Sequence, residues 1–258
     1  MEYVEISKVR PFAVVTDASS GIGYELALQF AVNGFDLLIA AKGEGLFEAQ
    51  EKLQEITDRV EAVQVDLATY KGVEELYSKI ITFGKPLEAI AINAGVGIGG
   101  EFIKTDLKEE VNLINLNIVS SIHLSKRVLK DMMKNGKGRI LFTASIASVT
   151  PEPFDAVYGA SKAFLLSFAE AIRNEAKDSG VTVTSLLAGA ANIGPEMKDE
   201  NDPADVARQS FEAMMAGREK VFAASLITKL EGWATKIIPD SVKAQYHRIL
   251  SEPGSVHQ

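Results

Sequence analysis

Residues 12–23 read Phe-Ala-Val-Val-Thr-Asp-Ala-Ser-Ser-Gly-Ile-Gly, and an amphipathic segment follows them directly. The apolar run at the start predicts a buried strand, and the amphipathic segment predicts a helix that begins in a glycine-rich turn. Backbone N–H groups and the helix dipole at such a turn can bind a pyrophosphate. The alternative is a serine-rich helix cap whose glycines serve only for tight packing.

Short apolar runs alternate with longer amphipathic segments as far as about residue 190. The predicted strands are Phe12–Thr16, Asp36–Ala41, Ala62–Val65, Glu88–Ile92, Arg139–Ala144 and Val181–Leu187. The predicted helices are Ile22–Asn33, Gly45–Thr57, Tyr70–Phe83, Leu107–Lys134 and Ala156–Asp178. Strands joined by helical crossovers pair in parallel. The pattern therefore predicts an α/β fold: a doubly wound, Rossmann-type parallel sheet of about seven strands with helices on both faces.

Beyond residue 190 the chain turns polar. We expect a helix at Pro203–Ala216, a strand at Lys220–Ala224, a helix near Leu226–Ile237 and a frayed tail from Ser251. The sequence contains no linker before residue 190 and no internal repeat. We therefore expect residues 1–258 to form one domain.

The composition is that of a globular protein, with 47% hydrophobic and 24% charged residues. Cysteine is absent and the three histidines are scattered, so we expect no disulfide, thiol nucleophile or metal site. A formal net charge of −8 opposes nucleic-acid binding. No apolar stretch is long enough to cross a membrane, and the acidic N-terminus does not resemble a signal peptide. We expect a cytoplasmic protein.

The strongest chemical signal is Tyr158-Gly159-Ala160-Ser161-Lys162, at the start of a predicted helix. Tyr158 and Lys162 are four residues apart and therefore share one helical face. Lowering a tyrosine pKa by about two to three needs about 3–4 kcal/mol. A unit charge about 4 Å away supplies on the order of 4 kcal/mol at an effective dielectric of 20. The lysine can thus make the phenol a proton donor and acceptor; the alternative is a surface packing pair.

Ser145 precedes Tyr158 by thirteen residues and directly follows a predicted strand. Ligands of open α/β sheets bind at the carboxyl ends of the strands. The Ser145 hydroxyl can therefore hold a substrate oxygen while Tyr158 transfers a proton.

With these motifs the chain resembles the short-chain dehydrogenase/reductase family in its shorter, single-domain form, from Phe12 to about Pro239. The resemblance implies a catalytic set of Asn117, Ser145, Tyr158 and Lys162. We choose Asn117 over Asn112 and Asn115 because Ser120 follows three positions later, where family members usually carry glycine. The alternative for Asn117 is an asparagine on a helix surface.

The resemblance also implies a nicotinamide dinucleotide cofactor. Its expected binding residues are Asp17, Ser19, Ser20, Gly21, Ile22, Gly23, Lys42, Asp66, Leu67, Asn93, Ala94, Gly95, Tyr158, Lys162, Ala188, Gly189 and Asn192. The string Gly95-Val96-Gly97-Ile98-Gly99-Gly100 matches a dinucleotide motif, but no amphipathic helix opens at its third glycine. We interpret it as a flexible loop beside the site.

Three positions depart from the family pattern. Asp17 replaces the first glycine of the turn, where a side chain is strained if φ is positive and where a carboxylate can repel a phosphate. Ala188 replaces a proline, and no threonine follows it, so Asn192 is the candidate for the nicotinamide carboxamide. The family's substrate lid, here near residues 190–216, is short. Lys42 at the end of the second strand favours NADP over NAD, because a base accommodates the 2′-phosphate.

The sequence thus predicts an NAD(P)-dependent oxidoreductase that transfers a hydride between nicotinamide and a small-molecule carbonyl or alcohol substrate, with Tyr158 as general acid/base. Asp17 and Ala188 favour the alternative, a non-catalytic dinucleotide-sensing or dinucleotide-binding protein on the same fold. Redox-neutral epimerase or dehydratase chemistry is disfavoured. Apolar residues spread widely around Leu107–Lys134 and, with the resemblance, predict a homodimer or homotetramer.

Overall fold

The computed structural model describes residues 10–189 and 202–223. Outside these residues lie all of residues 190–201, including Asn192, the predicted helix Leu226–Ile237 and the tail from Ser251. No helix within the described ranges combines the length and apolarity that a membrane span requires.

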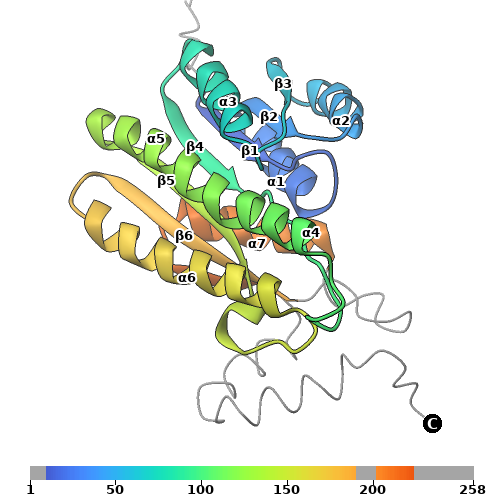
Figure 1. Cartoon of the computed structure of the whole chain (residues 1–258). Coiled ribbons are helices and arrows are strands. Elements are labelled where there is room, and N and C mark those ends of the chain that lie inside the picture. The colour runs from blue at the N-terminus through green and yellow to red at the C-terminus, as the bar shows by residue number, and fades with distance from the viewer. Residues whose placement is uncertain (1–9, 190–201, 224–258) are drawn as a thin grey trace, which may run out of the picture.

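Seven parallel strands form one sheet in the order β3-β2-β1-β4-β5-β6-β7, which confirms the predicted fold class (Figure 1). The strands are β1 (Phe12–Thr16), β2 (Asp36–Ala41), β3 (Val60–Gln64), β4 (Leu87–Ile92), β5 (Gly138–Ser145), β6 (Val181–Ala188) and β7 (Lys220–Ala223). The chain crosses from β3 back over β2 and β1 to place β4 beside β1. This reversal makes the carboxyl ends of β1 and β4 the expected ligand position of a doubly wound sheet.

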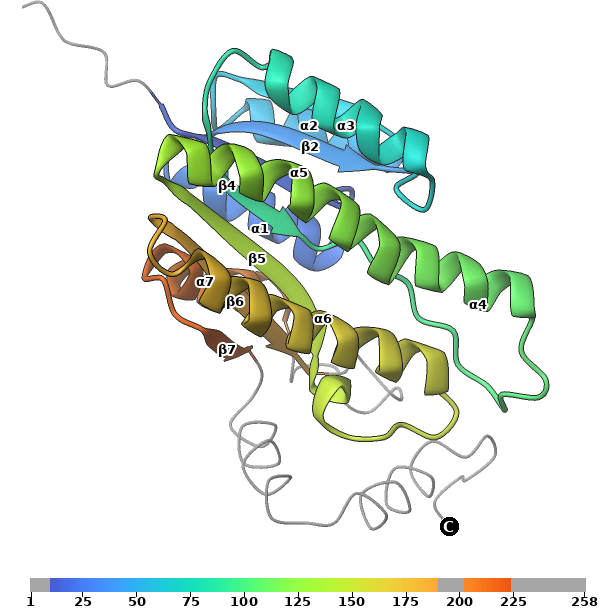
Figure 2. The same cartoon turned by 60° about the vertical axis from the view of Figure 1, so that its left-hand side comes forward.

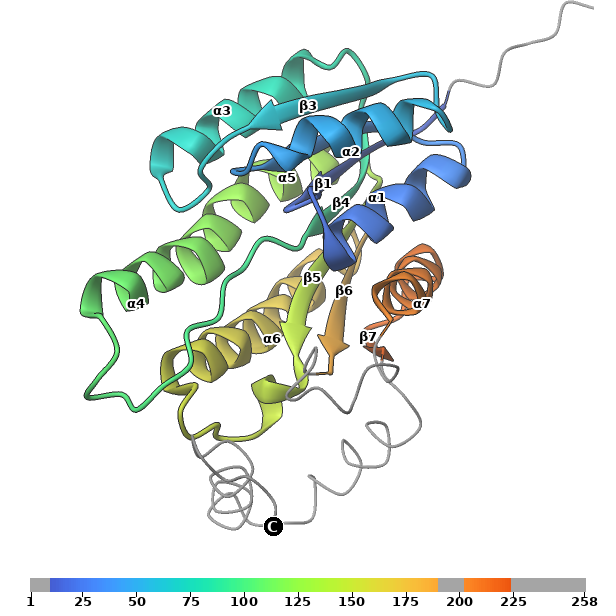
Figure 3. The ribbon, with the colours of Figure 1, turned by 90° about the vertical axis from the view of Figure 1, so that its right-hand side faces the viewer.

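Helices cover both faces of the sheet (Figures 2 and 3). They are α1 (Gly21–Val32), α2 (Gly45–Gln54), α3 (Tyr70–Thr82), α4 (Leu107–Ile114), α5 (Ser120–Asn135), α6 (Ala156–Ala176) and α7 (Pro203–Met215). One hydrophobic core joins α1, α2 and α7 to the sheet, and a second joins α3, α5 and α6 to the opposite face. Successive residues of β1 point into the two cores in turn: Ala13 into the first and Val14 into the second.

The prediction of a single continuous helix at Leu107–Lys134 is wrong at one point. A π-helical turn, η1 (Asn115–Val119), separates α4 from α5. Asn117 lies in this turn and is fully buried, so the extra residue of the π turn directs a polar side chain into the protein. The apolar residues of the segment divide accordingly: Leu113 and Leu124 are buried, whereas Leu107 is exposed.

Three glycines that follow helices adopt the left-handed conformation. Gly34, Gly136 and Gly180 have φ values of +83°, +67° and +78°. Gly180 also packs directly on Gly136, because a Cβ atom at Gly180 would lie 2.1 Å from the Gly136 carbonyl oxygen. Glycine is therefore required at position 180 for space as well as for conformation.

Candidate active site

The end of β1 is tied to the end of β4 by one buried hydroxyl. Thr16 Oγ1 accepts hydrogen bonds from the backbone N–H groups of Asn93 (2.9 Å) and Ala94 (3.0 Å). The Asn93 side chain continues this contact to the next strand, because its Oδ1 accepts from Thr143 Oγ1 at 2.8 Å. Buried side-chain hydrogen bonds thus connect the carboxyl ends of β1, β4 and β5.

The turn between β1 and α1 has the features of an anion site. Gly21 has φ +54°, and a Cβ atom there would meet only open space. Gly23 admits no side chain, because a Cβ atom would lie 1.9 Å from the Asp17 carbonyl oxygen. Ser20, the N-cap residue of α1, makes no side-chain hydrogen bond to the helix, and the first turn holds no acid. The first N–H groups of α1 therefore lack a side-chain cap and suit a phosphate.

Asp17 adopts the left-handed conformation that the first glycine of the motif would take, with φ +57°. The residue is exposed overall, yet nearby protein atoms desolvate its carboxyl and raise its pKa, while the charge of Lys162 acts in the opposite direction. Asp17 is therefore strained by its backbone and electrostatically coupled to the lysine of the predicted catalytic set.

Asn117 is a buried connector, so the alternative of a surface asparagine is wrong. Its Nδ2 donates to the Val96 carbonyl oxygen (3.0 Å) and to Ser161 Oγ (2.9 Å). Its Oδ1 accepts from the Val96 N–H at 2.9 Å. Asn117 thereby joins the loop after β4 to α6, and the exposed Asn112 makes no such contact.

Lys162 is buried, and its Nζ donates to the Thr143 carbonyl oxygen at 2.8 Å. A Cβ atom at Gly95 would lie 3.1 Å from this Nζ, so the glycine leaves room for the lysine. Burial lowers the pKa of Lys162 to about 8, while Asp17 acts to raise it. The Nζ lies 5.7 Å from the centre of the Tyr158 ring.

Tyr158 lies at the start of α6 and shares a side-chain hydrogen bond with Ser145. Burial raises the pKa of Tyr158, the hydrogen bond from Ser145 lowers it, and the charges of Glu152 and Asp155 raise it further. The sequence predicts that Lys162 lowers this pKa. In the structure the pKa of Tyr158 is raised instead, chiefly by burial, and the Lys162 ammonium donates to the Thr143 carbonyl oxygen.

The residues expected at the adenosine end form an ion pair. Lys42 Nζ lies 2.7 Å from Asp66 Oδ2, and hydrogen bonding by Lys42 lowers the pKa of the Asp66 carboxyl. Leu67 is buried beside them. The positive charge of Lys42 is thus partly neutralised by Asp66, which the sequence analysis also predicts to bind the cofactor.

The other predicted positions fall on the same edge of the sheet. Ala188 ends β6 in register with Ser145, and Gly189 follows it. Ser19 and Ile22 are half-buried in the turn before and within α1. Asn192 lies outside the described residues.

Sequence reasoning missed five contributors to this site: Thr16, Thr143, Glu152, Asp155 and Ser161. The hydroxyl of Ser161 donates to the Tyr158 carbonyl oxygen at 2.7 Å and also contacts Asn117, so it fixes the first turn of α6. The position of Ser161 between Tyr158 and Lys162 in the sequence was the signal that could have identified it as part of the site. In the described ranges, no group of three or more histidine, cysteine, aspartate or glutamate residues is placed to hold a metal ion.

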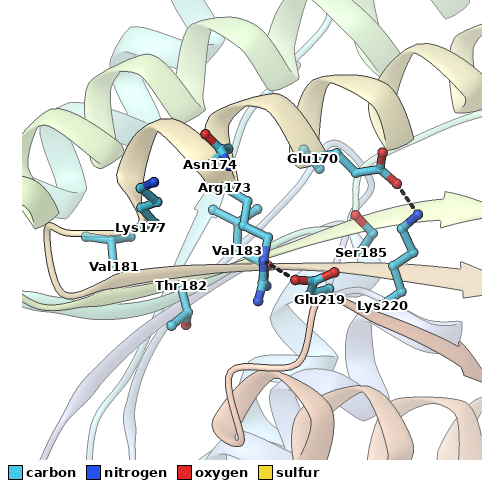
Figure 4. A pocket seen from close by; sticks show the side chains of 11 residues that line it. Glu170, Arg173, Asn174, Lys177, Val181, Thr182, Val183, Ser185, Glu219 and Lys220 are labelled. Carbon is cyan, nitrogen blue, oxygen red and sulfur yellow. Dashed lines mark hydrogen bonds and ion pairs between the residues drawn. The ribbon is translucent and has the colours of Figure 1, made fainter.

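A cavity of about 520 Å³ lies away from all these residues, between α6, β6 and the start of β7 (Figure 4). Its charged groups are largely paired. Arg173 donates to the carbonyl oxygens of Val183 and Gly217, and Lys220 forms an ion pair with Glu170. Arg173 thereby covers the part of β6 that extends past β7, which is a structural role at a sheet edge.

The sequence profile described as short chain dehydrogenase matches residues 11–205, and the chain belongs to this family. An uncharacterized short-chain type dehydrogenase/reductase of Sinorhizobium fredii is 33% identical over 178 residues, covering 69% of this chain and 68% of that protein. A short chain dehydrogenase/reductase of Burkholderia phymatum in complex with NAD has a TM-score of 0.80 at 21% identity, over 92% of this chain and 95% of that one. A short-chain dehydrogenase of Sphingobium yanoikuyae in complex with NADPH has a TM-score of 0.78 at 22% identity, over 90% and 97%. The chain is thus an oxidoreductase of the short-chain family.

Proposed function

We propose that this chain, as one domain, is an NAD(P)H-dependent carbonyl reductase or alcohol dehydrogenase that uses Tyr158 as general acid/base. The observation that supports it most is the grouping of Ser145, Tyr158, Lys162 and Asn117 around one end of the parallel sheet. Ser145 is hydrogen-bonded to Tyr158, and Asn117 holds the facing loop. A phenol with a bound serine hydroxyl at a strand end is placed to exchange a proton with a carbonyl oxygen.

The turn at Gly21 and Gly23 fits a dinucleotide, because the open space at Gly21 and the uncapped start of α1 suit a pyrophosphate. Lys162 would hold the nicotinamide ribose, and Asp66 and Leu67 would lie at the adenine end. Related short-chain enzymes have been solved with NAD and with NADPH. We favour NADP for this chain on account of Lys42, although its pairing with Asp66 reduces the charge that a 2′-phosphate would meet.

When bound, the dinucleotide supplies or accepts the hydride. In carbonyl reduction, the Tyr158 hydroxyl donates its proton to the substrate oxygen while the Ser145 hydroxyl holds that oxygen. In alcohol oxidation, Tyr158 removes the proton. Lys162 contributes a buried positive charge within 6 Å of the phenol ring. Asn117 keeps the loop at Val96 in place beside α6.

Cofactor binding and turnover test this proposal together. NADPH and NADH are titrated into the full chain by fluorescence, and reduction of butane-2,3-dione is followed by loss of reduced cofactor. We expect saturable binding, tighter for NADPH, with measurable turnover. Binding without turnover of any carbonyl tested would support the dinucleotide-binding alternative, and absence of binding would reject both.

The exposed face of α4 and η1 supports a proposal of self-association. Leu107, Val111, Ile114 and Val119 are all exposed on this segment. Leu107, Val111 and Ile114 recur at spacings of four and three and so share one face of α4, and an exposed apolar face of this kind is typical of an interface between subunits. We propose a homodimer or homotetramer, and light scattering at micromolar concentration measures its mass. A monomer at all concentrations would contradict it.

A further inference from the structure

Two carboxylates beside Tyr158 have no part in the reaction proposed above. Glu152 and Asp155 lie in the segment between β5 and α6, and both residues are half-buried. Neither carboxylate forms a hydrogen bond or ion pair with another residue within the described ranges, and Asp155 does not cap α6 with its side chain. Partly buried carboxylates are normally paired, and no partner within the described ranges compensates these two, so we consider a role for their charge.

Asp155 and the phenol lie against the same loop, and the Asp155 N–H donates to the Glu152 carbonyl oxygen at 3.2 Å. A Cβ atom at Gly99 would lie 3.5 Å from Asp155 Oδ1, and one at Gly97 would lie 3.6 Å from the Tyr158 ring. The Gly100 N–H donates to the Phe154 carbonyl oxygen at 2.7 Å. The loop after β4 and the segment before α6 therefore run side by side, as Figures 1 and 2 also show.

Electrostatic coupling links the two carboxylates to the phenol. Burial is the largest cause of the raised pKa of Tyr158, and the charges of Glu152 and then Asp155 add to it. Burial and the charge of Asp155 raise the pKa of Glu152 to about 7. The hydrogen bond from Ser145 is the one influence within the described residues that lowers the pKa of Tyr158.

A second feature of the segment is independent of charge. Thr150, two residues before Glu152, is only 7% exposed, and its hydroxyl has no hydrogen-bond partner in the described part of the chain. A buried hydroxyl without a partner is unfavourable in a folded protein. Not every polar group of this segment is therefore satisfied by the described residues.

We propose that Glu152 determines the charge selectivity of the Tyr158 site: together with Asp155, it disfavours carbonyl substrates that carry an anionic group next to the reacting carbonyl. Neutral and cationic carbonyl compounds are then the substrate class. This inference rests on the proposed function, because the field acts on a carbonyl that Tyr158 binds. The charged groups near Tyr158 are Glu152 and Asp155 from the segment before α6 and Lys162 from α6; Asp17 is coupled to Lys162.

Two probes of nearly equal size separate charge from shape. Butane-2,3-dione is neutral, whereas pyruvate carries a carboxylate oxygen in place of one methyl group. With the full chain and NADPH at pH 8, we measure kcat/KM for the dione and the inhibition constant of pyruvate against it. We expect Glu152→Gln to lower the pyruvate inhibition constant by about threefold to tenfold, because one negative charge is removed. Within each variant the pyruvate inhibition constant is compared with the KM for the neutral dione, so that a general change at the site cancels.

The effect depends on pH in a direction that the structure fixes. Glu152 is charged above pH 7 and largely neutral below it. The difference in pyruvate inhibition between wild type and Glu152→Gln is therefore expected to be large at pH 8 and small at pH 6. A merely structural role of Glu152 would give the same difference at both values.

The matched control is Glu109→Gln, an exposed acid in the first turn of α4 whose substitution changes the net charge equally. It leaves the pyruvate inhibition constant unchanged. Circular dichroism checks that each variant is folded. If wild type does not reduce butane-2,3-dione, the proposed function and this inference both fall. If the dione is reduced but pyruvate inhibition is the same in wild type and Glu152→Gln, only the inference is rejected.

Discussion

Tyr158 is a protonated phenol at neutral pH in this structure, because burial and two nearby carboxylates outweigh its hydrogen bond to Ser145. That is the form needed to donate a proton during carbonyl reduction. We expect Tyr158→Phe to lower kcat by about 10²–10⁴-fold, the usual contribution of general acid catalysis. The affinity for NADPH stays within about twofold of the wild-type value, because the proposed partner of the hydroxyl is the substrate oxygen and not the cofactor.

Steady-state kinetics and fluorescence titration check this expectation. Tyr70→Phe is the matched control. Tyr70 is exposed at the start of α3, and removing its hydroxyl group changes no contact of the proposed catalytic residues. Retained turnover in Tyr158→Phe would remove the tyrosine from the mechanism.

Asp17 carries two separable penalties, one of conformation and one of charge. A non-glycine residue in the left-handed region costs about 1 kcal/mol, and Asp17 has φ +57°. Asp17 also directly follows β1, just before the turn proposed to hold a pyrophosphate, and a carboxylate there can repel the phosphates. We expect Asp17→Gly to raise Tm by about 2–4 °C and to tighten NADPH binding by about threefold to tenfold.

Asp17→Asn divides the two effects. Asparagine keeps the backbone penalty but removes the charge, so we expect most of the gain in NADPH affinity without the gain in Tm. Calorimetry and fluorescence titration measure the two quantities. Weaker NADPH binding in both variants would show instead that the carboxylate binds the cofactor.

The predicted residues and the missed ones differ in the range of their contacts. Tyr158 and Lys162 were predictable because a spacing of four on a helix is a local pattern. Thr16 contacts Asn93, and Thr143 also contacts Asn93, across sequence separations of 77 and 50. No local pattern marks such a threonine. The direction of the Tyr158 pKa was equally beyond the sequence, since it depends mainly on how deeply the fold buries the phenol.

At the scale of elements, β1 and β2 were predicted to the residue, because apolar runs bounded by polar turns define buried parallel strands. The π turn at Asn115–Val119 was not predicted. It depends on hydrogen bonds from Asn117 to Val96 and Ser161, which belong to other elements. The asparagine itself was identified only through resemblance to the family.

Helix ends at glycine allow a paired test of packing against conformation. Gly34 and Gly180 both have strongly positive φ, but only Gly180 is crowded, by the carbonyl of Gly136. We expect Gly34→Ala to cost about 1 kcal/mol of unfolding free energy. Gly180→Ala is expected to cost a further 1–3 kcal/mol or so, because its Cβ overlaps backbone.

Urea unfolding monitored by circular dichroism gives both values. Gly34→Ala is the internal control, since it changes φ preference alone. Equal losses in the two variants would mean that the loop at Gly136 moves away without cost.

At the scale of the whole molecule, the sheet brings the ends of β1, β4, β5 and β6 to one edge, and this edge gathers the titratable groups that the mechanism uses. One consequence is a pH-dependent stability. Glu152 has a pKa of about 7 in the folded chain, against a value near 4.5 when exposed. Between these values the folded state binds more protons than the unfolded state, so stability falls as pH rises from about 4.5 to 7 and then levels off.

The loss from Glu152 is at most about 3 kcal/mol, which corresponds to a decrease in Tm of about 6–12 °C. We expect the difference in Tm between Glu152→Gln and wild type to be smallest near pH 4 and to grow in favour of the variant up to about pH 7.5. Scanning calorimetry at several pH values measures it, and subtraction of the two curves cancels the other titrating groups. Parallel curves would mean that Glu152 is solvated in the folded chain, so that water also screens its charge from Tyr158.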